Sequence, residues 1–201
     1  MKNCYTREQI KEAVIAKGHN WFDKGEFNVN IVGVRNADTG DTVTNKFDDC
    51  ITMSYIDESG DWQFACFPCT TDPGKHWVEN LLNKDGVAIL KEGQYSGSHK
   101  IRKHRGQYDA LCQKAPLKVY RDNNLDNEYD LIEENVKEGI YGINIHRAGA
   151  NSKQIDRWSA GCQVIAKRKH FDFFMNIAYK ANEAWGNSFT YTLINSNDIK
   201  K

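Results

Sequence analysis

The sequence is poor in features that mark several large classes of protein. Only three of its 201 residues are proline and six are cysteine. Six cysteines are too few for a disulfide-dense scaffold of this length, so we expect thiols, most of them small core residues. No internal repeat, low-complexity tract or linker rich in proline and serine interrupts the chain. This favours one domain over residues 1–201.

The sequence also lacks an excess of charge of one sign and a long apolar run. Lysine plus arginine number 27, as do aspartate plus glutamate, so the formal net charge is zero. Such a chain has no global field that attracts nucleic acid, and we expect no nucleic-acid partner. No stretch approaches the roughly 18 apolar residues of a spanning helix, and the first residues contain no signal-peptide core. We therefore expect cytoplasmic synthesis and no membrane span.

Short segments rich in β-branched and aromatic residues fill the middle of the chain, separated by Gly, Asn and Asp as strands usually are. The expected strands are 27–35, 50–56, 62–70, 86–90, 117–121, 141–146 and 189–195, with "DESGD" (57–61) as a hairpin connection. A capping-box pattern at Thr6 and Gln9 predicts a helix over about 7–17. A second helix over 169–185 should pack on the sheet through one face, formed by Phe171, Phe174, Ala178, Ala181 and Trp185. The predicted class is mainly β with flanking helices.

The stretch "GINIHRAGANSKQIDRWSAGCQVI" (142–165) contains the residues best suited to catalysis. Cys162 follows the small residues Ala160 and Gly161, which leave room for a carbonyl group to approach the sulfur. The N–H groups of Gly161 and Cys162 are the expected oxyanion donors. Alternation places His146 on the face opposite Ile145, where it can take the thiol proton and form a thiolate–imidazolium pair. The alternative is a buried apolar cysteine and a hydrogen-bonded surface histidine.

This order of residues resembles the active-site segment of the L,D-transpeptidase catalytic-domain family, in which a histidine precedes an SHGC box. The matching residues are His146 and the "SAGC" of Ser159, Ala160, Gly161 and Cys162, and "TTDPG" (70–74) is similar to an upstream "TPxG" stretch. The resemblance implies a mostly β catalytic domain whose cysteine acts on peptidoglycan stem peptides. The longer segment is also similar to versions found in phage-type wall-degrading proteins.

The segment departs from the family pattern at two places. Ala160 replaces the second histidine, so His146 must be the sole imidazole base. Gln163 and Val164 replace the Ile-Arg pair that commonly follows the cysteine, so recognition of a substrate carboxylate must come from elsewhere.

Arginines near the box are the candidates for that recognition. Arg147 and Arg157 suit carboxylates because a guanidinium group donates two parallel hydrogen bonds, although each could equally be an ordinary surface charge. Trp158 could wall the site, but an aromatic residue before a tight turn is more often core. With Gln163, these residues form the predicted substrate-binding set.

The predicted activity is a cysteine-dependent hydrolase of peptidoglycan stem peptides, similar to an endolysin, with a thioester intermediate resolved by water. We expect it to act on the wall after release from the cytoplasm. The alternatives are an L,D-transpeptidase, an L,D-carboxypeptidase in wall remodelling or muropeptide recycling, and a non-catalytic wall-binding module.

Three further stretches carry reactive or charged side chains. "SHKIRKHRG" (98–106) could hold an anionic polymer or line the cleft, but a solvated basic strand edge is favoured. "CFPC" (66–69) has the spacing of half a zinc site without a second pair, and we expect two buried thiols and no metal there. In 122–133, oxygen-bearing side chains occupy positions 1, 3, 5, 7, 9 and 12 of a calcium loop: Asp122, Asn124, Asp126, Glu128, Asp130 and Glu133. An ordinary acidic turn is favoured over calcium binding and no cofactor is expected, because the flanking helices of an EF-hand are absent and Asn127 stands where such loops carry glycine.

Overall fold

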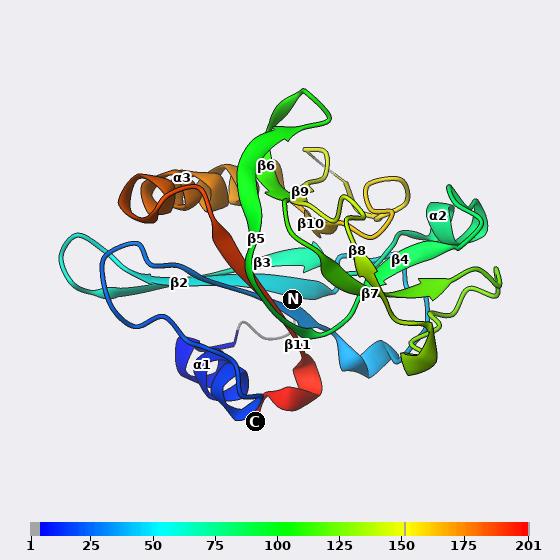
Figure 1. Cartoon of the computed structure of the whole chain (residues 1–201), viewed down its shortest axis with the longest axis horizontal. Helices are drawn as coiled ribbons and strands as arrows, with labels where there is room; N and C mark the ends of the chain where they lie inside the picture. Colours follow the sequence, from blue (N-terminus) through cyan, green and yellow to red (C-terminus); the bar gives the residue numbers. More distant parts are fainter. Residues whose placement is uncertain (1–4, 151, 201) are drawn as a thin grey trace.

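Eight strands close into a barrel in the computed structural model, which describes residues 5–150 and 152–200 (Figure 1). The order around the barrel is β1 (Asn30–Arg35), β11 (Phe189–Asn195), β5 (Gly93–His104), β6 (Tyr108–Gln113), β9 (Ile145–Arg147), β10 (Gln163–Ile165), β3 (Trp62–Thr70) and β2 (Asp49–Ile56). A separate sheet has the order β4 (Val87–Leu90), β7 (Leu117–Asp122) and β8 (Lys137–Gly139). The prediction of a mainly β class is confirmed. Cys4 lies outside the described residues.

The barrel interior and the helix α3 (Arg168–Trp185) share the main hydrophobic core. Ile51 of β2 and Leu193 of β11 point into it, and α3 adds Phe174 and Ala178, which are completely buried. The helix predicted over 169–185 is therefore confirmed. Trp185 differs from the expectation: it is 55% exposed, because this last helical residue turns its indole Nε1 to donate to the Glu26 carbonyl at 2.7 Å.

The first helix, α1 (Arg7–Ala16), packs on the outside of the barrel. Thr6 and Gln9 form the predicted capping box: Thr6 Oγ1 accepts from the Gln9 amide at 3.2 Å, and Gln9 Oε1 accepts from the Thr6 amide at 3.0 Å. The buried residues Ile10 and Val14 pack in one cluster with Val32 of β1. Local capping and tertiary burial therefore agree at this helix.

Most of the predicted strands are present, but the segment 141–146 is mainly irregular. Only its end joins the short strand β9, because the amide groups of Tyr141 and Ile143 donate to a side chain, Gln113 Oε1, both at 3.0 Å. β5 was expected only in part, as a basic strand edge over 98–106. Several other elements were not predicted: β6, β8, β10, the helix α2 (Lys75–Glu79), and the 3-10 turns Ala37–Thr39, Glu133–Asn135 and Ser196–Asp198. β5 lacks a clear apolar alternation, since "GQYSGSHKIRKH" is mostly polar.

The two cysteines of "CFPC" do not share a face of β3. Cys69 is fully buried in the barrel core, whereas Cys66 is half-buried. Residues three apart on a strand point to opposite sides, so the expectation of two buried sulfurs was wrong.

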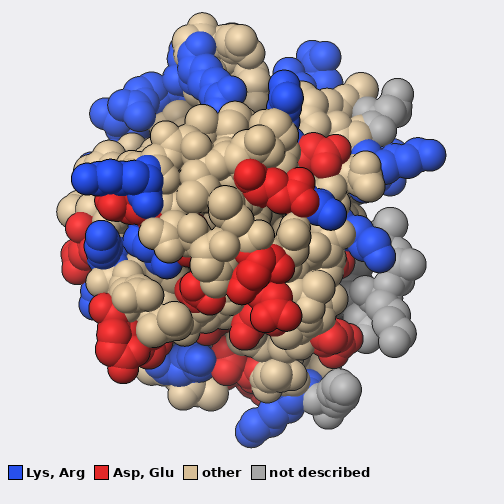
Figure 2. Space-filling model, turned by 90° about the vertical axis from the view of Figure 1, so that its right-hand side faces the viewer, with Lys and Arg blue, Asp and Glu red and all other residues tan. Residues whose placement is uncertain are grey.

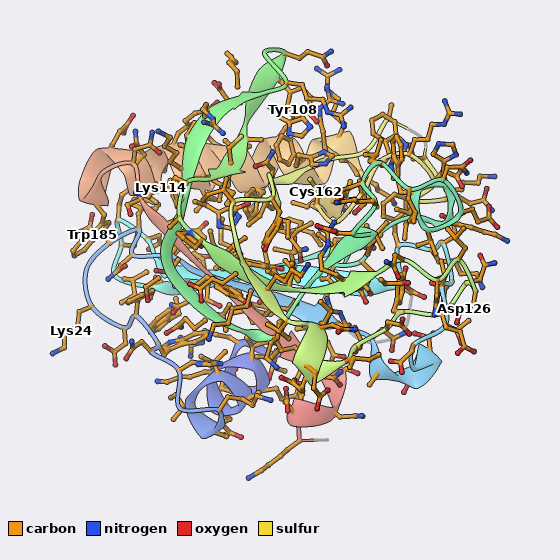
Figure 3. All side chains as sticks on the ribbon, turned by 45° about the vertical axis from the view of Figure 1, so that its right-hand side comes forward. Lys24, Tyr108, Lys114, Asp126, Cys162 and Trp185 are labelled. Carbon is orange, nitrogen blue, oxygen red and sulfur yellow. The ribbon has the colours of Figure 1, made fainter. Side chains whose placement is uncertain are left out.

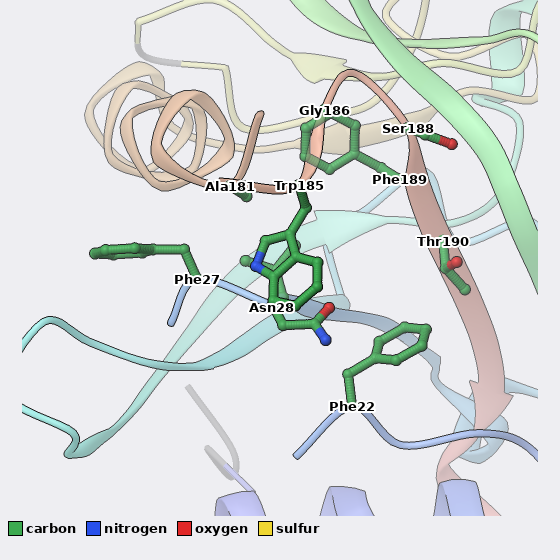
Figure 4. Close-up of a pocket in the computed structure, with 10 residues that line it drawn as sticks. Phe22, Phe27, Asn28, Ala181, Trp185, Gly186, Ser188, Phe189 and Thr190 are labelled. Carbon is green, nitrogen blue, oxygen red and sulfur yellow. The ribbon is translucent and has the colours of Figure 1, made fainter. Parts of the chain in front are cut away.

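A pocket of about 200 Å³ opens beside the end of α3 (Figure 4). The rings of Phe22, Phe27 and Trp185 line it together with Asn28 and Thr190. No helix in the described part of the chain is long and apolar enough to cross a membrane.

Candidate active site around Cys162 and His146

Two short parallel strands place Cys162 and His146 near each other. β9 pairs with β10 so that His146 lies opposite Val164. Cys162 directly precedes β10, and the Gln163 amide donates to the Asn144 carbonyl at 2.9 Å, so the pairing extends to this point. Continued alternation puts Cys162 on the face of Val164 and His146.

A hydrogen-bonded turn holds Cys162 at the start of β10. Ser159 is fully buried; its hydroxyl donates to the Cys162 carbonyl at 2.8 Å and accepts from the Gly161 amide at 3.1 Å. Gly161 has a φ of 130°, and a Cβ atom there would lie 2.3 Å from the Ala88 carbonyl oxygen. The amide of Gly74, in the "TTDPG" segment, donates to the Ser159 carbonyl at 2.8 Å. Ser159 and Gly161 thus shape the turn, and the prediction of the Gly161 amide as an oxyanion donor was wrong, because Ser159 already accepts from it.

Cys162 is half-buried, and backbone groups hold its sulfur. Its thiol donates to the Gly142 carbonyl at 3.4 Å, and it accepts from the Asn144 amide at 3.5 Å. Burial raises the pKa of this thiol to about 11, against the smaller opposing effect of the Asn144 amide. At neutral pH Cys162 is therefore a thiol, and its proton points to Gly142.

His146 is 3% exposed, not a surface residue, and its hydrogen bonds select one tautomer. Nδ1 lies 3.0 Å from the Arg147 carbonyl and 3.3 Å from the Tyr108 hydroxyl. A carbonyl only accepts, so Nδ1 carries the proton and Nε2 has the free lone pair. Burial, and then the neighbouring His104, lower the pKa of His146 to about 3. The resting pair is thus a neutral thiol and a neutral imidazole, whereas the sequence predicted thiolate and imidazolium.

A second imidazole, His104 at the end of β5, stacks on His146. The ring centroids are 4.2 Å apart and the planes differ by 19°. Asn144 Oδ1 accepts from the Gln113 amide at 2.9 Å, so its Nδ2 donates to His104 Nδ1 at 3.1 Å. His104 therefore carries its proton on Nε2. Burial is the main cause that lowers its pKa, so it adds no positive charge at neutral pH.

Sequence reasoning missed His104 because it treated "SHKIRKHRG" mainly as an exposed strand edge. Pairing of β5 with β11 ends at His99, and residues 100–104 continue with β6 in the hairpin that projects from the barrel in Figure 1. Arg102 and Lys103 are exposed there, as expected. His104 turns inward and is 7% exposed. Two histidines in one polar strand were the available signal.

The structure places the predicted substrate-binding residues unequally. Arg147 lies beside the site: its guanidinium carbon is 4.4 Å from the centroid of the Tyr108 ring, and Tyr108 and Cys162 lie in the same upper part of Figure 3. Arg157 is exposed on the loop before Ser159, and its carbonyl accepts from Trp77 Nε1 at 3.2 Å. Trp158, also in the predicted substrate-binding set, is 41% exposed, so the alternative of a core residue was wrong.

Gln163 cannot contact a substrate, because it is fully buried and its amide group is used internally. Its Nε2 donates to the Thr71 carbonyl at 3.1 Å, and its Oε1 accepts from the Tyr191 hydroxyl at 2.8 Å. This prediction was wrong: residue 163 is the first of β10 and points to the side opposite Cys162. Gln163 instead ties β10 to the "TTDPG" segment and to β11.

The assembled groups suit acyl transfer: a sulfur nucleophile, an imidazole with a free Nε2 on the same face, and an arginine beside them. Comparisons with protein-family models, with curated proteins and with solved structures found no match to this chain.

Proposed function

We propose that this chain is a cysteine-dependent hydrolase of peptidoglycan stem peptides, similar in its active-site segment to the L,D-transpeptidase catalytic domain. The observation that carries the proposal is the register of β9 and β10, which brings the turn of Cys162 to the strand of His146, together with the Nδ1 contact that leaves His146 Nε2 unprotonated. The same turn contains Ser159 and Gly161, the other residues of the matched box.

The resting state requires the proton transfer to accompany the attack. A bound substrate carbonyl approaches Cys162, the thiol proton leaves the Gly142 carbonyl for His146 Nε2, and the sulfur forms a bond to the carbonyl carbon. The N–H of Cys162 is the remaining predicted oxyanion donor, because Ser159 accepts from Gly161. Collapse of the intermediate breaks the amide bond, and His146 returns the proton to the leaving amine.

Water then hydrolyses the thioester and restores the thiol. If an amine of a second stem peptide attacks in its place, the same site performs L,D-transpeptidation, and attack by water after loss of a terminal residue corresponds to L,D-carboxypeptidase activity. Arg147, whose guanidinium lies over the Tyr108 ring, is the residue that we infer binds a stem-peptide carboxylate.

Mass spectrometry of purified sacculi after incubation tests the proposal. We expect released stem-peptide fragments and intact glycan strands, and no release by Cys162→Ala or His146→Ala. Cys50→Ala, an equally small change at a half-buried cysteine of β2, is the matched control and should keep full activity. An added diamino acid that appears in the products would assign transpeptidation. New reducing sugar ends without peptide cleavage, or an active Cys162→Ala protein, would refute the assignment.

A further inference from the structure

The loop that follows β7 contains a buried carboxylate without full hydrogen bonding. Asp122, the last residue of β7, is 1% exposed, and its Oδ2 has no hydrogen-bond partner. Its Oδ1 accepts from the Asn124 amide at the long distance of 3.4 Å. A buried carboxylate oxygen is unfavourable unless a cation or a donor compensates it.

Two more carboxylates surround Asp122. The Asn124 Nδ2 group donates to Asp126 Oδ2 at 2.9 Å and to Asp130 Oδ2 at 3.2 Å, so it lies between two negative groups. The Asn124 backbone N–H donates to Asp122 Oδ1, so this one residue links all three carboxylates.

Two cations of the neighbouring strands are engaged with other groups. Arg121 donates to the carbonyls of Asp85 at 3.2 Å and Gly86 at 2.5 Å. Lys91 pairs with Glu133, which also accepts from the Tyr120 hydroxyl at 2.9 Å. Glu133, the twelfth residue of the predicted calcium loop, is therefore engaged elsewhere, and that part of the sequence prediction does not fit.

The backbone of the loop turns sharply at Asn127, as the backbone of a calcium loop does at its sixth position. Asn127 has a φ of 64°, the left-handed conformation for which calcium loops use glycine, and its Oδ1 is a second buried oxygen without a partner. The Asn127 carbonyl accepts from the Val43 amide at 3.1 Å, and the Tyr129 amide donates to the backbone carbonyl of Asp41 at 2.6 Å. Asp126 is labelled on this side of the molecule in Figure 3, and Figure 2 shows acidic side chains gathered on the face that lies to the right in Figure 1.

We propose that residues 122–130 bind Ca²⁺ through carboxylate oxygens of Asp122, Asp126 and Asp130, with Asn124 contributing Oδ1 after its amide rotates. In the conformation described, no group of three or more His, Cys, Asp or Glu side chains among the described residues could hold a metal ion. The Asn124 NH₂ group bridges the carboxylates instead, and the cation replaces it. Ca²⁺ suits the loop because it accepts several oxygen ligands in flexible geometry.

Titration calorimetry and thermal unfolding of the full chain, first treated with EDTA and desalted, test this site with CaCl₂ and MgCl₂. Calcium should give saturable binding and a rise in melting temperature, because a ligand specific to the folded state stabilises it. Asp122→Asn and Asp126→Asn should each lose both signals. Glu138→Gln, at an exposed residue of β8, is the control for general charge effects and should keep them.

Asp122→Asn removes a charge repelled by its neighbours, so in EDTA it should melt at or above the parent temperature. If that variant does not fold, Asp126→Asn decides the test, since Asp126 is exposed. The weakest sites of this kind have dissociation constants of about 1 mM, so absence of binding at about 10 mM calcium would overturn the proposal. Retention of binding in Asp126→Asn would overturn it too. None of these measurements uses peptide cleavage, so they stand apart from the proposed hydrolase activity.

Discussion

The resting state of Cys162 leads to a prediction opposite to the one from sequence alone. A thiolate–imidazolium pair would make Cys162 the most reactive of the six cysteines toward iodoacetamide at mildly acidic pH. In the structure burial raises the pKa of Cys162 to about 11 and lowers that of His146 to about 3. We therefore expect slow labelling of Cys162 in the folded protein without substrate.

The size of the effect follows from the thiolate fraction. Raising the pKa from 9.0 to about 11 lowers that fraction about 100-fold at any pH below about 8. A thiolate of higher pKa is intrinsically more nucleophilic. With a Brønsted coefficient of about 0.4–0.5, each thiolate reacts roughly 6- to 10-fold faster, which offsets part of the loss. Cys162 should thus react roughly 10- to 15-fold more slowly in the folded chain than in the same chain unfolded in urea.

Labelling over a series of pH values, with peptide mapping at each time point, measures this ratio. His146→Ala should change the labelling rate of Cys162 little, because a neutral imidazole does not stabilise the thiolate at rest, yet it should abolish turnover. The neutral pair would be refuted if Cys162 labels faster at pH 6 in the folded than in the unfolded chain and if His146→Ala slows that labelling. That result would support a thiolate–imidazolium pair.

Two further predictions concern stability, each measured by urea unfolding. Gly161→Ala should cost about 2 kcal/mol or more, because its Cβ lies 2.3 Å from the Ala88 oxygen at a φ of 130°. Gly60→Ala, with a φ of 82° and no atom within 4 Å, should cost only about 1 kcal/mol, and equal losses would contradict the steric reasoning. Burial lowers the pKa of His99 from 6.5 to about 4. The contribution of the neutral His99 side chain to the stability of the fold is therefore present above pH 6.5 and is lost as the pH falls toward 4. The stability gap between the parent and His99→Gln should narrow by about 2–3 kcal/mol between about pH 7.5 and 4.5, and a constant gap would contradict it.

The sequence by itself determined those helices and strands that their own capping residues or apolar pattern identify. The capping box before α1, the apolar face of α3 and the strand 62–70 need no distant partner to be recognised, and each lies within two residues of its predicted bounds. The sequence also singled out Cys162 and His146, because the turn residues around them limit what the backbone can do.

Contacts between distant segments decided the rest. His104 reaches His146 only because β6 pairs with both β5 and β9, and its orientation depends on Asn144 and Gln113. The neutral state of the pair has the same origin, since burial by surrounding chain sets both pKa values. Gln163 shows the principle most simply: its position next to Cys162 suggested substrate contact, but strand alternation turns it to the opposite side of β10, where Thr71 and Tyr191 use its amide. Sequence therefore determined which groups stand near the catalytic candidate along the chain, and tertiary structure decided which of them face it and in what protonation state.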